Sequence, residues 1–340
     1  MNRHRVTIIA GAAALVSTFF LSAQTKGPVP PKAPLGLIPV QWPRDNPYSP
    51  EKVELGKLLY FDTRLSADNT VACATCHGLK NGFTDGAPVS TGIRGQKGGR
   101  SAPTVINRAY TQTQFWDGRA PSLEEQAKGP IQNPIEMGYT HEACVAKLKT
   151  IKGYVDMFEK VFGTRDFNID HVAKAIATFE RTVLSGNSAY DKYKAGNKSA
   201  MNASAVRGLA IFEKKKCDQC HEGVNFTLGA FHNLGVGTDK PNPDEGRSAI
   251  SKDPKDWGAF KTPTLRDISR TAPYMHDGSL KSLEEVVDYY DKGGMPNKNL
   301  DERMKKLNLT AQEKQDLVAF MKALDGDSWH SIKAPTKFPQ

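Results

Sequence analysis

Apolar side chains recur at helical spacing in several separate stretches of the chain, with polar residues between them. Two of these stretches follow a glycine, at residues 56–61 and 208–212, and two longer amphipathic ones cover residues 170–184 and 310–324. A fifth helical pattern covers residues 141–149. No run of alternating apolar and polar residues is long enough to propose a sheet. The pattern predicts a mostly α-helical fold with little or no β structure.

The predicted helices belong to a unit that occurs twice. Ala102-Pro103-Thr104 leads to Phe115-Trp116-Asp117-Gly118 and then to Ser122-Leu123-Glu124-Glu125. Thr262-Pro263-Thr264 leads, at the same spacings and without a gap, to Met275-His276-Asp277-Gly278 and then to Ser282-Leu283-Glu284-Glu285. The Ser-x-x-Glu pattern typically begins a helix, because the serine side chain caps the first turn. The repetition predicts two similar domains that arose by internal duplication.

The first residues resemble an export signal. Arg3 and Arg5 precede a mostly apolar run at residues 6–21, and small residues around Ala23 offer a cleavage site. We expect a signal peptide at residues 1–23; the alternative is an uncleaved anchor helix, although the run is shorter than a membrane-spanning helix requires. Both interpretations place the folded part outside the cytoplasm, and we expect the periplasm.

Composition is typical of a soluble, loop-rich protein. Apolar residues make up 39% and charged residues 24%, with 29 glycines and 21 prolines, and the mean hydropathy is −0.50. These values exclude a polytopic membrane protein, a coiled coil and a disordered tail. The net charge of +9 favours an acidic partner surface. No Lys/Arg block with interleaved aromatic residues is present, so we expect no nucleic-acid partner.

Cysteine gives the strongest chemical signal. Four of the five cysteines lie in two copies of Cys-x-x-Cys-His, namely Cys73-Ala74-Thr75-Cys76-His77 and Cys217-Asp218-Gln219-Cys220-His221. Two thiols about one helical turn apart can reach the two vinyl groups on one haem edge, and the adjoining histidine then faces the iron. A zinc site or disulfides would not explain the histidine after each pair. We therefore expect two covalently bound haem c groups, and we interpret Cys144 as an unpaired, structurally neutral thiol.

The repeat predicts that the two haems differ. Met275 precedes His-Asp-Gly in the second copy, and a thioether is a natural sixth ligand that raises the potential of a His-ligated haem. Phe115 has the same position in the first copy and cannot bind iron. Met275 as an ordinary core residue and His276 as the ligand are the alternatives. We favour Met275, because His276 shares its repeat position with Trp116.

These motifs together resemble the bacterial di-haem cytochrome c peroxidases and their relatives of the methylamine-utilisation type. The resemblance extends from about Pro43 to the end of the chain and includes Asn133-Pro134-Ile135-Glu136-Met137-Gly138 and Ala272-Pro273-Tyr274 before Met275. It implies two cytochrome-c-like haem domains, a peroxidatic one at residues 24–195 and an electron-transfer one at 196–340. It also implies a calcium ion between them and reduction of hydrogen peroxide in the periplasm.

The resemblance assigns a role to each candidate residue. His77 is the proximal ligand of the peroxidatic haem, with Glu136 and Gln126 in its distal pocket. Trp116 lies between the haems. His221 and Met275 hold the electron-transfer haem. Cys73, Cys76, Cys217 and Cys220 form the thioether links.

Glu136 suits the chemistry that this role requires. Peroxide needs a proton moved from its inner to its outer oxygen before its O–O bond breaks, and a partly buried carboxylate performs both transfers. Taken alone, Glu136 and Gln126 would be ordinary surface residues and Trp116 a core aromatic. Three arginines near the motifs are candidate partners of the haem propionates or ordinary surface charges: Arg100, Arg119 and Arg266.

Two positions depart from the family pattern. Many members carry a histidine between the first haem motif and the Pro-Thr segment, where it blocks the peroxidatic iron until the other haem is reduced. Ile93 has that position here, which predicts activity without prior reduction. Ser101 stands where the family often places a calcium-binding asparagine, which leaves backbone carbonyls near Asp256 and Gly258 as calcium ligands.

Three functions fit these features. The first is peroxide reduction, with electrons from a small c-type cytochrome or a cupredoxin. The second is oxidative modification of a protein substrate, as in the methylamine-utilisation relatives, although those replace the axial methionine with tyrosine. The third is a di-haem electron carrier, which would need an axial ligand on both haems. We favour the first, and a homodimer is a further candidate assembly.

Overall fold

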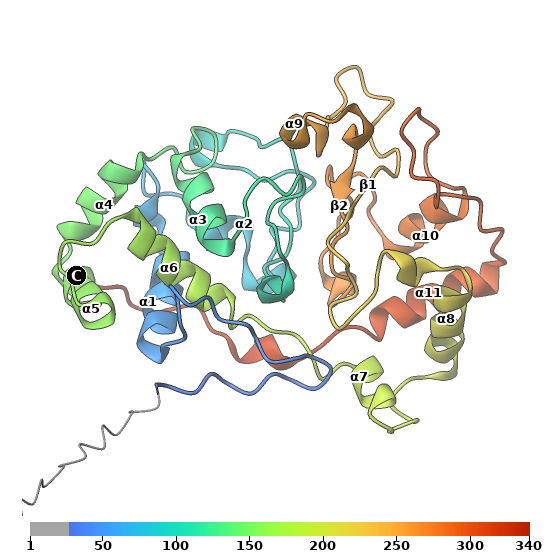
Figure 1. Ribbon diagram of the computed structural model, residues 1–340, viewed down its shortest axis with the longest axis horizontal. Coiled ribbons are helices and arrows are strands. Elements are labelled where there is room, and N and C mark those ends of the chain that lie inside the picture. Colours follow the sequence, from blue (N-terminus) through green and yellow to red (C-terminus); the bar gives the residue numbers. More distant parts are fainter. Residues whose placement is uncertain (1–26) are drawn as a thin grey trace, which may run out of the picture.

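The computed structural model describes residues 27–340, which form two helical halves side by side (Figure 1). The expected signal peptide lies outside the described residues. The helices of the first half are α1 (Pro50–Phe61), α2 (Cys73–Cys76), α3 (Leu123–Gln132), α4 (His141–Lys149), α5 (Lys152–Phe162) and α6 (Ile169–Glu180). After them come α7 (Ala189–Lys194), α8 (Ala203–Lys214), α9 (Ser248–Ser251), α10 (Leu283–Asp291) and α11 (Ala311–Lys322). No helix within residues 27–340 has the length and apolar character to cross a membrane.

The fold class is as predicted. The β structure of residues 27–340 is one antiparallel pair of two-residue strands, β1 (Phe231–His232) and β2 (Phe260–Lys261), apart from isolated bridges. The capping patterns also form as predicted. The hydroxyl oxygens of Ser122 and Ser282 each accept a hydrogen bond of 3.1 Å from the backbone N–H three residues on, at the start of α3 and α10.

The internal duplication is visible in the helix packing. α1 packs against α6 in the first half, and α8 packs against α11 in the second. Each pair approaches closely at a glycine of its first helix. A Cβ atom on Gly56 would lie 1.8 Å from the carbonyl oxygen of Ala175, and one on Gly208 would lie 1.9 Å from that of Asp316. The glycine of the sequence pattern therefore marks where each helix pair touches.

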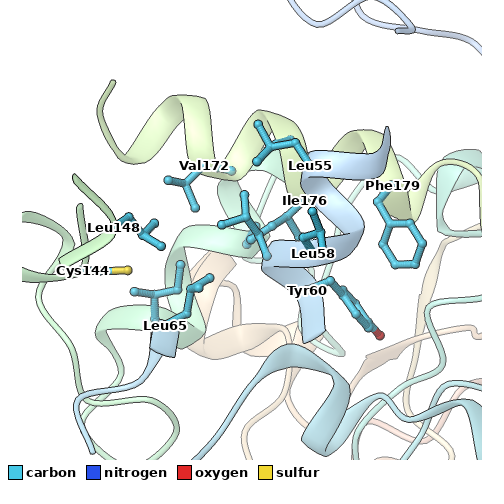
Figure 2. Packing of buried hydrophobic residues seen from close by; sticks show 14 of the residues in the cluster. Leu55, Leu58, Tyr60, Leu65, Cys144, Leu148, Val172, Ile176 and Phe179 are labelled. Atoms are coloured by element: carbon cyan, nitrogen blue, oxygen red, sulfur yellow. The ribbon is translucent and has the colours of Figure 1, made fainter. Parts of the chain in front are cut away.

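The first core lies between α1, α6 and α4. Figure 2 shows Leu55 and Leu58 of α1 facing Val172 and Ile176 of α6. Cys144 of α4 is fully buried in this core and unpaired. Burial raises the pKa of its thiol to about 12. Cys144 is thus unpaired, as predicted. It is not structurally neutral, because its side chain forms part of the first core.

Two segments of the chain cross between the halves. Trp329, after the last helix, is buried in the first core, and the backbone oxygen of Gln340 accepts a hydrogen bond of 2.7 Å from the N–H of Gly153 in α5. In the opposite direction, Tyr190 of α7 packs in the second core, and Asp191 of α7 forms a buried ion pair of 2.8 Å with Arg266. The division of the chain at residues 195 and 196 stays a prediction.

Two helices differ from the sequence pattern. The helix predicted at 170–184 ends at Glu180. Beyond it, the backbone oxygen of Val183 accepts a hydrogen bond of 2.9 Å from the N–H of Asn107, so the chain leaves the helix to join a loop that carries the Pro-Thr segment. α5 was not predicted, although Tyr154 and Phe158 on one face of it are fully buried.

We predict that alanine at either crossing glycine destabilises the fold. Helix propensity alone would make Gly208→Ala more stable by about 1 kcal/mol. The overlap with the Asp316 backbone should outweigh this and cost about 1–3 kcal/mol, as overpacking does. Thermal denaturation measures the effect, with exposed Glu213→Ala on the same helix as the control. An unchanged or raised Tm for both Gly56→Ala and Gly208→Ala would contradict the packing described here.

Candidate haem sites

The first haem motif lines a cavity of about 360 Å³ in the first half. Cys73, Cys76 and His77 face it from α2 and the residue after it, and Gln126 faces it from α3. Glu136 reaches it from the loop that follows α3. The structure therefore brings together the thiols, the histidine and both predicted distal residues, which are separated by up to about sixty positions in the chain.

His77 is held for ligation on its backbone side. The short helix α2 places its N–H 2.9 Å from the carbonyl oxygen of Cys73, and its own carbonyl accepts a hydrogen bond of 2.7 Å from the Tyr60 hydroxyl. Burial lowers the pKa of the His77 ring to about 4, so the ring is neutral at pH 7. A neutral imidazole is the form that binds a metal. Its Nδ1 is buried without a hydrogen-bond partner.

Glu136 sits on a loop held by the segment that contains Ile93. The N–H of Ile93 donates a hydrogen bond of 2.9 Å to the carbonyl oxygen of Glu136. Burial raises the pKa of the Glu136 carboxyl, and the positive charge of Arg119 opposes this. The Ile93 side chain is 2% exposed, packs in the first core and does not line the cavity. At the position of the family's blocking histidine, this chain therefore has a core residue that supports the Glu136 loop.

The second haem motif lines a separate cavity of about 250 Å³. Cys217, Cys220, His221 and Met275 all face it. The Nδ1 of His221 lies 3.1 Å from the carbonyl oxygen of Phe226. Because a carbonyl only accepts, Nδ1 carries the proton and Nε2 keeps a free lone pair. Burial also lowers the pKa of the His221 ring to about 4.

Phe115 and Met275 occupy the same unusual backbone conformation. Their φ angles are +64° and +73°, in the left-handed region that costs a side chain about 1–2 kcal/mol. Each residue lies in a turn closed by an antiparallel bridge, Gln114 with Ala120 and Tyr274 with Leu280. Both side chains line their cavities. His276 also lines the second cavity, with its ring stacked 3.6 Å from that of Phe260, so the choice of Met275 as ligand stays a prediction.

Trp116 lies at the boundary and lines both cavities. Its indole N–H donates a hydrogen bond of 2.9 Å to the carbonyl oxygen of Ser101. The N–H of Ser101 in turn donates one of 2.7 Å to the carbonyl oxygen of His276. A chain of two hydrogen bonds thus connects the turn of the first half with the turn of the second, which suits the predicted position of Trp116 between the haems.

The three arginines proposed for the propionates each pair with an aspartate of the chain. Arg100 lies 2.7 Å from both Asp117 and Asp244, and Arg119 lies 2.9 Å from Asp117. Arg266 pairs with Asp191 and lines neither cavity. Arg266 is 1% exposed, so it is not a surface charge either.

Four cavity residues were missed by the sequence analysis: Arg108, Met137, Glu180 and Lys261. Glu180 is 5% exposed, and its Oε2 is buried without a hydrogen-bond partner. Burial raises the pKa of its carboxyl to about 8. A charged residue among the buried positions of the 170–184 pattern was the signal that could have revealed it.

The calcium site stays a prediction. Among residues 27–340, no three His, Cys, Asp or Glu side chains converge in a way that could hold a metal ion. The buried Ser101 uses its backbone N–H and carbonyl in the hydrogen bonds to His276 and Trp116. A calcium ion would therefore depend on backbone carbonyls elsewhere, as predicted near Asp256 and Gly258.

The two cavities suit haem c. Each combines two free thiols with a neutral, partly buried histidine on one turn, which is the donor set for thioether attachment and iron ligation. The buried Nδ1 of His77 lacks a partner, as expected where a bound group completes the surroundings of the ring. His77 and His221 would hold the irons, and Met275, the predicted further ligand, faces the second cavity.

Comparison with known proteins agrees with this geometry. The family model described as di-haem cytochrome c peroxidase matches residues 50–199, and the cytochrome c model matches residues 205–325. The cytochrome-c peroxidase IdrP1 of Pseudomonas sp. (strain SCT) is 38% identical over 95% of this chain and 93% of its own length. The methylamine utilization protein MauG of Methylorubrum extorquens is 42% identical over 85% of this chain and 82% of its own length.

A solved structure is also similar. The crystal structure of a MauG-like protein associated with microbial copper homeostasis has a TM-score of 0.80 and 35% identity. The match covers 86% of this chain and 95% of that one. The likeness extends through both helical halves, so it includes both cavities.

We predict that Glu180→Gln changes how stability depends on pH. Glu180 binds its proton more tightly when folded, with a pKa of about 8 against an ordinary 4.5. Between these values the folded state holds the proton and the unfolded state does not, so the Glu180 contribution falls as pH rises. Glutamine removes this loss. The Tm of Glu180→Gln relative to the unmodified protein should therefore rise from about pH 5 to pH 8.

Glu284→Gln, at an exposed position of α10, is the matched control and should show no such trend. Parallel plots of Tm against pH for Glu180→Gln and the unmodified protein would show that Glu180 ionises normally in the folded state.

Proposed function

Because the chain belongs to the di-haem cytochrome c peroxidase family, we propose that it reduces hydrogen peroxide to water with electrons from a small redox protein. One observation carries this proposal. The first cavity joins a Cys-x-x-Cys-His motif with Glu136 and Gln126, while Trp116 connects it to a second cavity that contains Met275. The first arrangement suits a reaction site, and the second suits an electron-transfer site.

Haem c, when bound, supplies redox-active iron in both cavities. The chain supplies the groups that move protons. Glu136 takes the proton from the inner oxygen of peroxide and returns it to the outer oxygen, which leaves as water. The raised pKa of Glu136 makes its carboxylate a stronger base at neutral pH. Gln126, which faces the same space from α3, orients the peroxide by hydrogen bonding.

Electrons enter at the second cavity. Its rim includes the exposed side chains of Lys216, Arg303 and Lys305, which favour a donor with an acidic surface. A small c-type cytochrome or a cupredoxin of that charge fits the site. Trp116, hydrogen-bonded towards the second half through Ser101, is the relay to the first cavity.

The position of Ile93 supports activity without prior reduction. Its side chain is enclosed in the first core, and its backbone is bonded to the Glu136 loop. Met137 is a thioether that also lines the first cavity, but it is not at the repeat position of Met275. We therefore expect the as-isolated protein to react with peroxide without a lag.

Oxidation of a protein substrate is the second candidate, because MauG of Methylorubrum extorquens is 42% identical to this chain. Met275 counts against it, since the family resemblance implies an axial tyrosine in that branch. An electron carrier without catalysis is a third candidate. Glu136 in the first cavity counts against it, because a carrier has no use for a basic group beside the iron.

Export to the periplasm, a calcium ion and a homodimer complete the proposal. Export rests on the signal-like residues 1–23 and on two haem motifs. Calcium rests on the family resemblance and on carbonyls near Asp256 and Gly258, and the homodimer on the resemblance alone.

We predict that Glu136→Gln slows peroxide cleavage by about 10²–10⁴, the usual contribution of general acid–base catalysis. Glutamine keeps the shape and hydrogen-bonding capacity but cannot accept the proton. Stopped-flow mixing of the reduced variant with peroxide measures the rate, and haem content and the potential of the second haem serve as controls. A rate equal to that of the unmodified protein would make Glu136 structural. An unmodified protein that does not react with peroxide would favour the carrier.

Replacement of the predicted axial ligand should change the second haem alone. Met275→His should lower its midpoint potential by more than about 0.1 V, because a thioether favours Fe(II) more than imidazole does. Potentiometry with the low-spin ferric spectrum measures this. Peroxide reactivity at the first haem should persist in the pre-reduced variant. An unchanged potential and spectrum would transfer the ligand role to His276, the neighbouring residue in the same cavity.

A further inference from the structure

Two buried cations beside the cavities form no ion pair with any residue of the described chain. Arg108 is 8% exposed and Lys261 is 4% exposed. Among residues 27–340, no ion pair within 4.0 Å includes Arg108 or Lys261. The carboxylates of Asp117, Glu124 and Asp191 pair with other arginines. Two other arginines that line the first cavity, Arg100 and Arg119, are already paired with Asp117.

Most of the hydrogen-bond donors on these two side chains are unused. Arg108 donates from Nε to the carbonyl oxygen of Thr104 at 2.6 Å, and no bond is formed by its two terminal nitrogens. Lys261 donates from Nζ to the carbonyl oxygen of Thr113. A guanidinium has five N–H donors and an ammonium has three, so each side chain can bind a further acceptor.

Burial without a counterion is costly for both groups. It lowers the pKa of Lys261 to about 6 and that of Arg108 to about 10. The repulsion between them adds to the effect at Lys261, and Asp117 opposes it. The carboxyl of Glu180 acts on Arg108, but its own pKa of about 8 keeps it largely protonated at pH 7. The two cations therefore have no ionised partner in ion-pair contact within the described chain, and a bound anion would remove the excess charge.

The positions of the two cations indicate where that anion lies. Arg108 lines both cavities, and Lys261 lines the second. Lys261 is in β2, and its backbone N–H donates a hydrogen bond of 2.8 Å to the carbonyl oxygen of Trp116 at the boundary. Both cations thus face the interior from the boundary between the halves, close to the proposed electron relay.

We propose that Arg108 and Lys261 bind haem propionates, with Lys261 paired to the second haem and Arg108 to a propionate at the boundary of the two cavities. Haem c carries two carboxylates opposite its thioether edge, and a carboxylate is the acceptor that both side chains lack. With these partners, the propionate edges of the haems would lie on the side of the cavities where Trp116 lies. The proposal rests on the two-haem part of the proposed function and is independent of peroxide chemistry.

The assignment gives Lys261 a role in setting the potential of the second haem. A paired cation offsets the negative propionate, which otherwise stabilises Fe(III). Without the cation, Fe(II) should be less favourable. The paired arginines Arg100 and Arg119 would contribute less, because Asp117 already neutralises them.

The test compares Lys261→Met with Lys261→Arg in the haem-loaded protein. At about pH 8 the propionate is ionised, and its negative charge should hold Lys261 in the charged form by raising the pKa of the ammonium. Lys261→Met should then lower the midpoint potential of the second haem. We expect at least a tenfold change in the ferric-to-ferrous ratio at the potential of the unmodified midpoint, equivalent to about 59 mV for one electron. The propionate bending bands in resonance Raman spectra should shift as well, and Lys261→Arg should restore both.

Lys306→Met is the matched control, because it removes the same charge from an exposed position of the second half that lines neither cavity, where solvent screens it. Arg108→Met, compared with Arg108→Lys, tests the other cation by the same Raman bands. Unchanged potential and bands in Lys261→Met would overturn the assignment for Lys261. Loss of haem in both Lys261→Met and Lys261→Arg would overturn it too, since a packing role would then explain the residue. A protein that shows the expected shifts but does not react with peroxide would refute the peroxidase proposal alone.

Discussion

Two backbone hydrogen bonds of Ser101 connect the two halves, and the relative position of the two cavities depends on them. Its carbonyl accepts from the indole of Trp116, and its N–H donates to the carbonyl of His276. Trp116 and His276 are equivalent residues of the two repeats, each directly after the residue that faces its cavity from a strained turn. A single buried peptide segment thus fixes the two turns relative to each other, and with them the two cavities.

Duplication gives both halves the same backbone framework. Substitutions between the two copies make their sites different. Each half has a helix pair that meets at a glycine, a haem motif on one turn and a side chain at positive φ aimed into a cavity. In the first half this side chain is Phe115, and the guanidinium carbon of Arg119 lies 3.5 Å from the centre of its ring. Met275 offers a thioether at the other. The same backbone conformation therefore presents a different side chain to each cavity.

Charge in the boundary region has two distinct functions. Arg100, Arg119, Asp117 and Asp244 form a network that is complete within the chain and holds the first turn against the segment at Asp244. Arg108 and Lys261 remain uncompensated by the chain, and this difference makes them candidates for binding an anionic cofactor edge. The two segments that cross between the halves add to the same connection, since Trp329 is buried in the first core while Asp191 pairs with Arg266 in the second half.

The sequence by itself determined the features that depend on residues close together in the chain. The haem motifs, the repeat, the capping serines and the helix at residues 141–149 all follow from short-range spacing, and the structure has them. The partners of charged groups depend on residues far away in the chain. For that reason Arg266 was a candidate for the propionates although it pairs with Asp191, and Glu180, Arg108 and Lys261 were missed. The end of α6 was misplaced for the same reason, because a hydrogen bond from Asn107 decides it. Only the tertiary structure could decide which polar groups are buried, which are already paired and which face a cavity, since burial and pairing are set by contacts between distant segments.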